Sequence, residues 1–272
     1  MKTQVIAQLK KLLSLADLNV SKYSTQVTTD QVMERLHLSN ETLTYTIGRA
    51  RQNLDMLLRI PDERLLPWVF ESQAQLWQDL FVLHELNFKR NGFFVEFGAT
   101  NGMTLSNTYL LEKKFGWNGI LAEPARIWQQ DLARNRTAVI EKKCVWSKSD
   151  DVLMFNQTDV AELSTINAYS GSDFHEASRK NGTTYAVDTI SLVDLLRVHQ
   201  APAMIDYLSI DTEGSEFEIL KNFDFKEFKF RVITCEHNDT PERDKIYSHL
   251  TAHGYARKYT ELSKFDDWYV LA

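Results

Sequence analysis

Residues 93–102 read Phe-Phe-Val-Glu-Phe-Gly-Ala-Thr-Asn-Gly, and this stretch decides the fold. The apolar residues at 93–95 and Phe97 form a short run of the kind that is buried in a parallel sheet. Gly98 and Gly102 then break the run, as is expected where a loop passes close to a ligand. The stretch therefore predicts a buried strand that ends in a glycine turn at a ligand pocket.

A helical segment and a second strand follow this turn. The second strand is predicted at residues 119–122, and Glu123 comes directly after it. In a strand–helix–strand unit, an acid at this position can accept hydrogen bonds from both ribose hydroxyls of a nucleotide. The layout of residues 92–124 therefore predicts a nucleotide pocket.

Glu96 distinguishes between the nucleotides that such a pocket could hold. A carboxylate just before the glycine turn would repel a pyrophosphate, but it would attract the ammonium of a methionine moiety. The spacing Glu96-x-Gly98-x-x-x-Gly102 also lacks the three-glycine fingerprint of dinucleotide sites. The glycines alone would be ordinary turn residues, and the acids alone would be solvent-facing strand ends. Their combination favours S-adenosylmethionine over NAD.

The predicted cofactor contacts extend beyond the glycine turn. Val145 and Trp146 are expected to form an apolar wall for the adenine, with Ser147 or Asp150 as a polar contact. Trp146 has a core position as its alternative, because large aromatic residues at strand ends are commonly buried. The predicted cofactor-binding residues are Glu96, Phe97, Gly98, Ala99, Thr100, Asn101, Gly102, Glu123, Pro124, Val145, Trp146 and Asp211.

Length and composition limit the class of protein. A chain of 272 residues suits one catalytic domain with an appendage, which we place at residues 71–272 and 1–70. The net charge of −6, without a long basic block, argues against a nucleic-acid partner. The two cysteines suggest no disulfide framework, and no apolar stretch is long enough for a membrane span. A cytoplasmic location is expected.

Periodicity predicts the order of elements along the chain. Residues 1–70 read as helices, which could form a lid, a partner surface or a homo-oligomer seam, or simply pack on the main domain. Strands alternate with helices from residue 93 onward, and a terminal antiparallel pair is expected at residues 255–259 and 268–271. Residues 156–184 show no sustained period and are predicted to form a long loop. This pattern predicts an α/β domain with an open, mostly parallel sheet and ligands at its carboxyl edge.

Four segments resemble one known family. They are F-F-V-E-F-G-A-T-N-G at 93–102, S-N-T-Y-L-L-E-K-K-F-G-W-N-G-I-L-A-E-P at 106–124, D-Y-L-S-I-D-T-E-G-S-E-F-E-I-L at 206–220 and C-E-H-N at 235–238. Over residues 72–272 the chain resembles the FkbM-type methyltransferases, in which Gln75, Gln78 and Asp79 also match, although Ala74 replaces an expected serine. The resemblance implies a Rossmann-like, seven-stranded sheet flanked by helices. It also implies methyl transfer from S-adenosylmethionine to a hydroxyl of a small molecule or a glycan sugar.

Catalytic candidates follow the predicted fourth and fifth strands. A sugar hydroxyl needs a base within hydrogen-bond reach, and His237 is the first candidate because its pKa suits that role. Its alternative is to cap a strand end, and His175 is the reserve base. Asp211 and Glu213 are expected to touch the acceptor or the sulfonium. No metal site is predicted, although Asp211, Glu236 and His237 together could bind a divalent ion.

Two other functions remain open at this point. Fold alone does not decide function, so a NAD-dependent oxidoreductase is the principal alternative. A non-catalytic binding protein that keeps the cofactor fold is the other.

Overall fold

The structure is a computed structural model that describes residues 48, 52, 55–171 and 175–272. The chain divides into two compact units, Met1–Leu58 and Arg59–Ala272. The domain boundary expected at residues 70 and 71 stays a prediction. Arg59 forms an ion pair of 3.0 Å with Glu261 near the other end of this unit. The helices expected before residue 48 lie outside the described residues.

A seven-stranded sheet forms the centre of the larger unit, in the order β10-β11-β9-β8-β1-β2-β3. The strand β11 runs antiparallel to both of its neighbours, and the other neighbouring pairs are parallel. The mostly parallel Rossmann-like sheet is confirmed, with one reversed strand. The strands are β1 (Phe93–Phe97), β2 (Asn118–Ala122), β3 (Val139–Glu141), β8 (Met204–Ile210), β9 (Lys229–Glu236), β10 (Tyr255–Lys258) and β11 (Asp266–Leu271).

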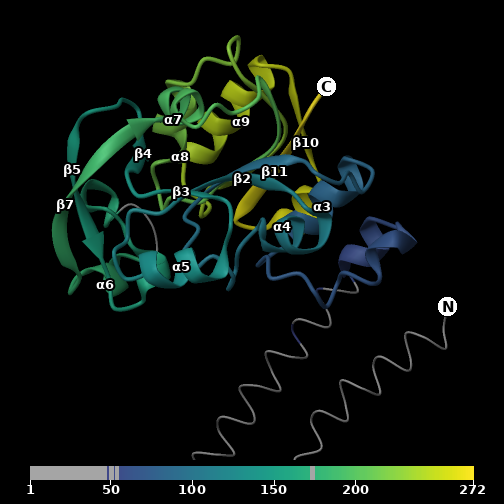
Figure 1. Ribbon diagram of the computed structural model, residues 1–272, viewed down its shortest axis with the longest axis horizontal. Helices are drawn as coiled ribbons and strands as arrows, with labels where there is room; N and C mark the ends of the chain where they lie inside the picture. Colours follow the sequence, from purple (N-terminus) through teal and green to yellow (C-terminus); the bar gives the residue numbers. More distant parts are fainter. Residues whose placement is uncertain (1–47, 49–51, 53–54, 172–174) are drawn as a thin grey trace, which may run out of the picture. The chain divides into compact units, whose positions relative to one another are not determined.

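Helices cover both faces of this sheet (Figure 1). On one face lie α3 (Gln78–Glu85), α4 (Tyr109–Phe115) and α5 (Gln129–Asn135), and on the other lie α7 (Leu192–Val198), α8 (Glu216–Lys221) and α9 (Glu242–Ala252). Two short helices, α6 (Glu176–Arg179) and α10 (Thr260–Ser263), are also present, and 3-10 turns lie at Glu63–Leu65, Ala161–Leu163 and Asn167–Tyr169. The flanking helices that the sequence predicted are confirmed.

The chain order reverses between β1 and β8, which are neighbours in the sheet. From β1 the chain proceeds outward through β2 to β3, and after an insertion it returns to β8 and proceeds the other way. Open α/β sheets bind ligands at such a switch point, outside the carboxyl ends of the strands. The loops after Phe97 and after Ile210 therefore border the expected site.

The insertion between β3 and β8 contains a second sheet, which the sequence did not predict. It has the order β4-β7-β5-β6, with β4 (Cys144–Trp146), β5 (Val152–Gln157), β6 (Thr165–Ile166) and β7 (Thr183–Ser191). The structureless loop expected at 156–184 is therefore wrong. Between β3 and β4 the chain leaves the central sheet at a turn, in which the Glu141 side chain accepts hydrogen bonds from the amides of Lys142 and Lys143.

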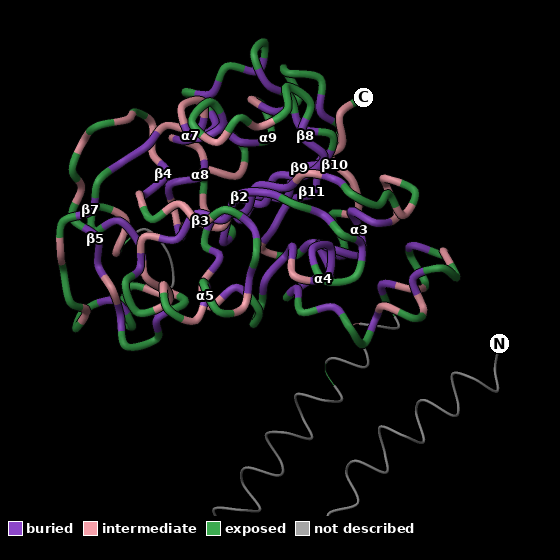
Figure 2. Tube along the Cα trace, in the orientation of Figure 1, coloured by how far each residue is buried: buried purple, intermediate pink, exposed green. Residues whose placement is uncertain are grey.

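Burial follows the central sheet. Figure 2 shows β2, β8, β9 and β11 as mostly buried segments, as the continuous apolar runs predicted. The terminal antiparallel pair of β10 and β11 is confirmed. Within the described residues, no helix has the length and apolar character needed to cross a membrane.

Candidate functional site

A cavity of about 300 Å³ opens at the carboxyl ends of β1, β2, β8 and β9. This volume lies in the range of small-molecule sites. Nine of the predicted site residues line it: Glu96, Phe97, Gly98, Thr100, Glu123, Pro124, Val145, Asp211 and Glu213. The sheet thus brings residues that are more than 100 positions apart in the sequence to one pocket.

The glycine turn forms the floor of this cavity. Gly98 has a φ of +69° and Thr100 a φ of +45°, so the chain reverses sharply after β1. The turn is joined to the next strand because the Gly98 amide donates to the Ala122 carbonyl at 3.1 Å. Ala99, Asn101 and Gly102 shape the turn but are not among the described residues that line the cavity. Gly102 also has a positive φ, +78°.

Glu123 lies directly after β2 and is buried. Its carboxylate accepts hydrogen bonds from the amides of Thr100 and Ala125, both at 2.8 Å. Burial, with a smaller contribution from the charge of Asp211, raises the pKa of Glu123 to about 7, although the two amide hydrogen bonds act to lower it. The carboxylate is therefore held in a fixed position at the cavity wall, where two hydroxyl donors would stabilise its charged form.

Glu96 holds the loop that follows the glycine turn. Its carboxylate accepts from the amide of Asn107 at 2.7 Å, from the hydroxyl of Ser106 at 3.1 Å and from the hydroxyl of Thr108. The guanidinium of Arg136 lies 3.6 Å away. Glu96 lines the cavity while it is engaged by these donors, so a contact with a ligand ammonium stays a proposal.

Asn107 offers an unused acceptor beside Glu96. Its side-chain nitrogen donates to Ser209 at 2.9 Å, but its Oδ1 atom is buried and has no hydrogen-bond partner among the described residues. An ammonium group supplies three donors and would satisfy this oxygen. The residues present therefore fit a nucleoside whose ribose meets Glu123 and whose amino-acid end meets Asn107.

Apolar side chains form another wall of the cavity. Val145 lines it as predicted, together with Phe155 and Ile166 from the second sheet. Trp146 is not among the lining residues, and its ring packs edge-on against Tyr169 at 6.0 Å. Its predicted adenine contact is therefore not supported by the geometry. Ser147 and Asp150 likewise lie outside the set of lining residues.

The loop after β8 carries two acidic residues into the cavity. Its shape is set by Glu216, whose carboxylate accepts from the amides of Thr212 at 2.8 Å and Gly214 at 3.1 Å. Glu213 and Gly214 have φ values of +59° and +118°. This tight turn explains the sequence Asp-Thr-Glu-Gly-Ser-Glu, because the last acid fixes the loop that presents the first two.

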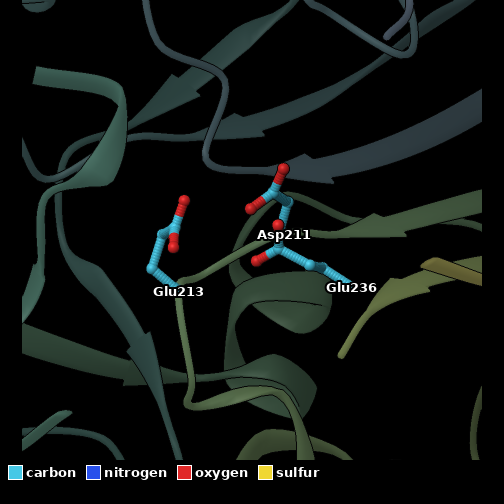
Figure 3. Close-up of side chains that lie close together, drawn as sticks. All are labelled: Asp211, Glu213 and Glu236. Atoms are coloured by element: carbon cyan, nitrogen blue, oxygen red, sulfur yellow. The ribbon is translucent and has the colours of Figure 1, made fainter. Parts of the chain in front are cut away.

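Asp211, Glu213 and Glu236 converge at the end of the cavity (Figure 3). Each offers one carboxylate oxygen, and these oxygens lie within 4.8 Å of one another. Burial raises the pKa of Asp211 to about 6. Burial, together with the charge of Asp211, raises the pKa of Glu236 well above its usual value. Two carboxyl groups this close do not both ionise readily, so Asp211 ionises first and Glu236 keeps its proton to higher pH.

Glu213 connects this cluster to the insertion. The buried guanidinium of Arg179 donates to Glu213 Oε2 at 2.6 Å. The side-chain amide nitrogen of Asn238 lies 3.5 Å from the same oxygen. Arg179 also donates to the carbonyl of Leu163 at 2.8 Å. The insertion is thus fixed against the acidic end of the cavity. No periodic pattern in the sequence marks Arg179, which is not among the predicted site residues.

His237 is not brought to the cavity. Glu236 and Asn238 line it, whereas His237 is absent from the described lining residues, because side chains alternate in direction at the end of a strand. The Nδ1 atom accepts from the amide of Asp239 at 3.0 Å, and Nε2 lies 3.8 Å from Asp267. Burial lowers the pKa of His237. The geometry does not support His237 as the base, whereas the reserve candidate His175 does line the cavity.

The chain is similar to several solved structures. The chain resembles, among solved structures, a precorrin-6y C5,15-methyltransferase from Geobacter metallireducens at 13% identity and a TM-score of 0.37, covering 71% of this chain and 85% of that one. It also resembles a TehB-like methyltransferase from Corynebacterium glutamicum at 7% identity and a TM-score of 0.35, covering 76% of this chain and 92% of that one. No curated protein matches the chain.

A protein-family model also matches the chain. Residues 96–268 match the methyltransferase FkbM domain, and this segment contains the glycine turn, Glu123 and all three residues of the acidic cluster. Because the match spans more than half of the chain, the chain belongs to the FkbM methyltransferase family, and its cofactor is S-adenosylmethionine.

Proposed function

We propose that this methyltransferase transfers its methyl group to a hydroxyl oxygen of a small molecule or a glycan sugar. The observation that carries the proposal is the convergence of Asp211, Glu213 and Glu236 at one end of the cofactor cavity. Of the functions that the sequence left open, the family match supports the methyltransferase and gives no support to a NAD-dependent oxidoreductase. A non-catalytic role would not require an acidic cluster beside the cofactor.

The acidic cluster suits a hydroxyl acceptor. Bound S-adenosylmethionine supplies a methyl group on a positively charged sulfur. The acceptor oxygen forms a bond to the methyl carbon, and the carbon–sulfur bond breaks with its electron pair going to sulfur. The hydroxyl proton passes to a carboxylate of the cluster, for which Asp211 is the first candidate because its pKa of about 6 leaves it largely ionised at neutral pH.

The end of the cavity that carries the cluster also suits an acceptor rich in hydroxyls. Gln75 lines the cavity beside Asp211 and Glu236. Carboxylates accept hydrogen bonds from hydroxyls, and amide groups both donate and accept them. We assign this end of the cavity to the acceptor and the end at Glu123 to the cofactor.

The test is to identify the atom that receives the methyl group. The purified enzyme is incubated with cofactor labelled with carbon-13 in its methyl group and with a panel of sugars, glycosides, amines and thiols. The carbon-13 chemical shift of the product distinguishes methyl groups on oxygen, nitrogen and sulfur. A methyl ether on a polyhydroxylated compound is the expected product.

Two variants link the product to the site. Asp211→Asn should abolish ether formation while it retains binding of S-adenosylhomocysteine, and Asp244→Asn, an exposed acid on α9, should behave as wild type. A methylamine or thioether as the main product would overturn the proposal. If Asp211→Asn formed the ether at the same rate as wild type, Asp211 would not be the base that accepts the hydroxyl proton.

Other expectations from the sequence stay proposals. A cytoplasmic location is supported by Cys144 and Cys235, which are buried free thiols. The absence of a nucleic-acid partner rests on the net charge of −6. An oligomer formed through the N-terminal helices would involve residues outside those that the structure describes.

A further inference from the structure

We propose that Asp211, Glu213 and Glu236 bind one divalent cation of the Mg²⁺ type next to the bound cofactor. The sequence predicted no metal site. It considered Asp211 and Glu236 only in combination with His237, whose ring faces Asp267 instead. The structure replaces that histidine with Glu213 and so offers a ligand set composed entirely of oxygen atoms.

The spacing of the carboxylates fits one ion. Their nearest oxygens all lie within 4.8 Å of one another. Ligands on opposite sides of one ion are about 4 Å apart for Mg²⁺ and about 5 Å apart for Ca²⁺, since the bonds are roughly 2.1 and 2.5 Å long. Only small side-chain rotations would be needed for all three to reach the same ion. Oxygen ligands select Mg²⁺, Mn²⁺ or Ca²⁺ over the softer metals.

A separate observation at Glu236 indicates a missing ligand. The residue is only 7% exposed, and its Oε2 atom is buried without a hydrogen-bond partner among the described residues. A buried carboxylate oxygen that receives no donor is costly, and such groups are normally paired or coordinate a metal. Figure 3 shows the Glu236 carboxyl group extending from the end of β9 toward Asp211. A cation at the centre of the cluster would satisfy this oxygen.

Neighbouring residues hold the cluster in a fixed arrangement. Arg179 and Asn238 orient Glu213 through its Oε2 atom, and the loop that carries Asp211 is fixed by Glu216. Ligands that neighbouring residues hold in position are what a specific metal site requires.

The cation site deepens the proposed function and rests on it, because the role of the cation depends on a hydroxyl acceptor. A cation at this point would hold the acceptor oxygen and lower the pKa of its hydroxyl. The proton would then pass to the second oxygen of Asp211 or Glu236 as the bond to the methyl carbon forms. Binding of the cation can be measured without any acceptor, so the two proposals can fail separately.

The experiment uses the full chain after removal of metals by a chelator. Free Mn²⁺ is followed by electron paramagnetic resonance during a titration, with and without S-adenosylhomocysteine. We expect one Mn²⁺ per chain, competition by Mg²⁺, and affinity about tenfold or more weaker in Glu236→Gln and in Asp211→Asn. Glu63→Gln, an exposed acid on a 3-10 turn, should bind Mn²⁺ as wild type does.

Folding of each variant is checked by circular dichroism and by calorimetric binding of S-adenosylhomocysteine. Wild-type protein that binds S-adenosylhomocysteine but no Mn²⁺ at millimolar concentration would overturn the cation site and leave the proposed function standing. Mn²⁺ binding that is unchanged in both cluster variants would also overturn it. A metal-binding wild type that forms no methyl ether would support the site and contradict the proposed function.

Discussion

The carbonyl oxygen of Asp211 lies so close to Gly98 that a Cβ atom on Gly98 would come within 2.1 Å of it. These residues follow β1 and β8, the two neighbouring strands at which the chain order reverses. The turn that approaches the cofactor and the loop that carries the acidic cluster are therefore in direct contact. We therefore expect a change at Gly98 to disturb the loop that carries Asp211 as well as the glycine turn.

Gly98→Ala should disrupt this contact. The substitution places a side chain against backbone and forces a φ of +69° on a residue with a Cβ atom, which costs about 1–2 kcal/mol before the clash is counted. Affinity for S-adenosylhomocysteine should fall about tenfold or more, as measured by calorimetry. Gly171→Ala is the control, since its nearest contact would be an ordinary 3.8 Å. Equal affinities of the two variants would contradict the close approach.

The raised pKa of Glu123 predicts that cofactor affinity depends on pH. The ribose hydroxyls need the ionised carboxylate, and the pKa of Glu123 is about 7. Affinity for S-adenosylhomocysteine should therefore rise as pH increases through 7 and should be about tenfold weaker at pH 6 than at its plateau. Glu123→Gln should remove this dependence, and the same pH profile in both proteins would exclude Glu123 as its origin.

The same raised pKa has the opposite effect on the stability of the cofactor-free protein. The folded state holds the proton of Glu123 more tightly than the unfolded state, in which the pKa is near 4.5. The contribution of this group to stability is therefore complete below pH 4.5 and is lost as pH rises through about 7. Urea unfolding should measure the free energy of unfolding of wild type and Glu123→Gln across this range. The free energy of wild type relative to the variant should be highest below pH 4.5 and should fall as pH rises through about 7.

Arg136 should be essential for the structure around the glycine turn. Its side chain is fully buried, lies 2.7 Å from Glu112 and 3.6 Å from Glu96, and donates to the carbonyl of Gly102. Arg136→Met leaves two buried carboxylates without their cation, so the free energy of unfolding should fall by about 3–5 kcal/mol. Arg134→Met is a matched control, because Arg134 forms an exposed pair with Asp131 and its loss should cost less than about 1 kcal/mol. If urea unfolding showed a similar loss of unfolding free energy in Arg136→Met and Arg134→Met, the role assigned to Arg136 would be contradicted.

His237 and Asp211 should differ in their effect on turnover. The His237 ring accepts a hydrogen bond from Asp239 outside the cavity, and His237→Asn keeps an acceptor at that position. Its kcat with a hydroxyl acceptor should stay within about threefold of wild type, whereas Asp211→Asn should lower kcat by about 100-fold or more. A larger loss in His237→Asn than in Asp211→Asn would restore the histidine as the base.

The sequence predicted the parts of the fold whose signals are local. The apolar run before Gly98 and the acid after residue 122 identify the cofactor edge of the sheet, because strand ends and glycine turns depend on adjacent residues. The second sheet was missed because β5 alternates exposed Val152 and Met154 with partly buried residues and β6 has only two residues. Arg179 was missed because a buried ion pair depends on Glu213, which is distant in the sequence. The direction of the His237 side chain could not be predicted, because proximity to a strand end does not define which side of the strand a residue faces.

The most direct measurement is a crystal structure of the chain with S-adenosylhomocysteine. Both ribose hydroxyls should donate to the Glu123 carboxylate, and the sulfur should face the cluster of Asp211, Glu213 and Glu236. A ribose bound away from Glu123, or a sulfur directed away from these three carboxylates, would contradict the account.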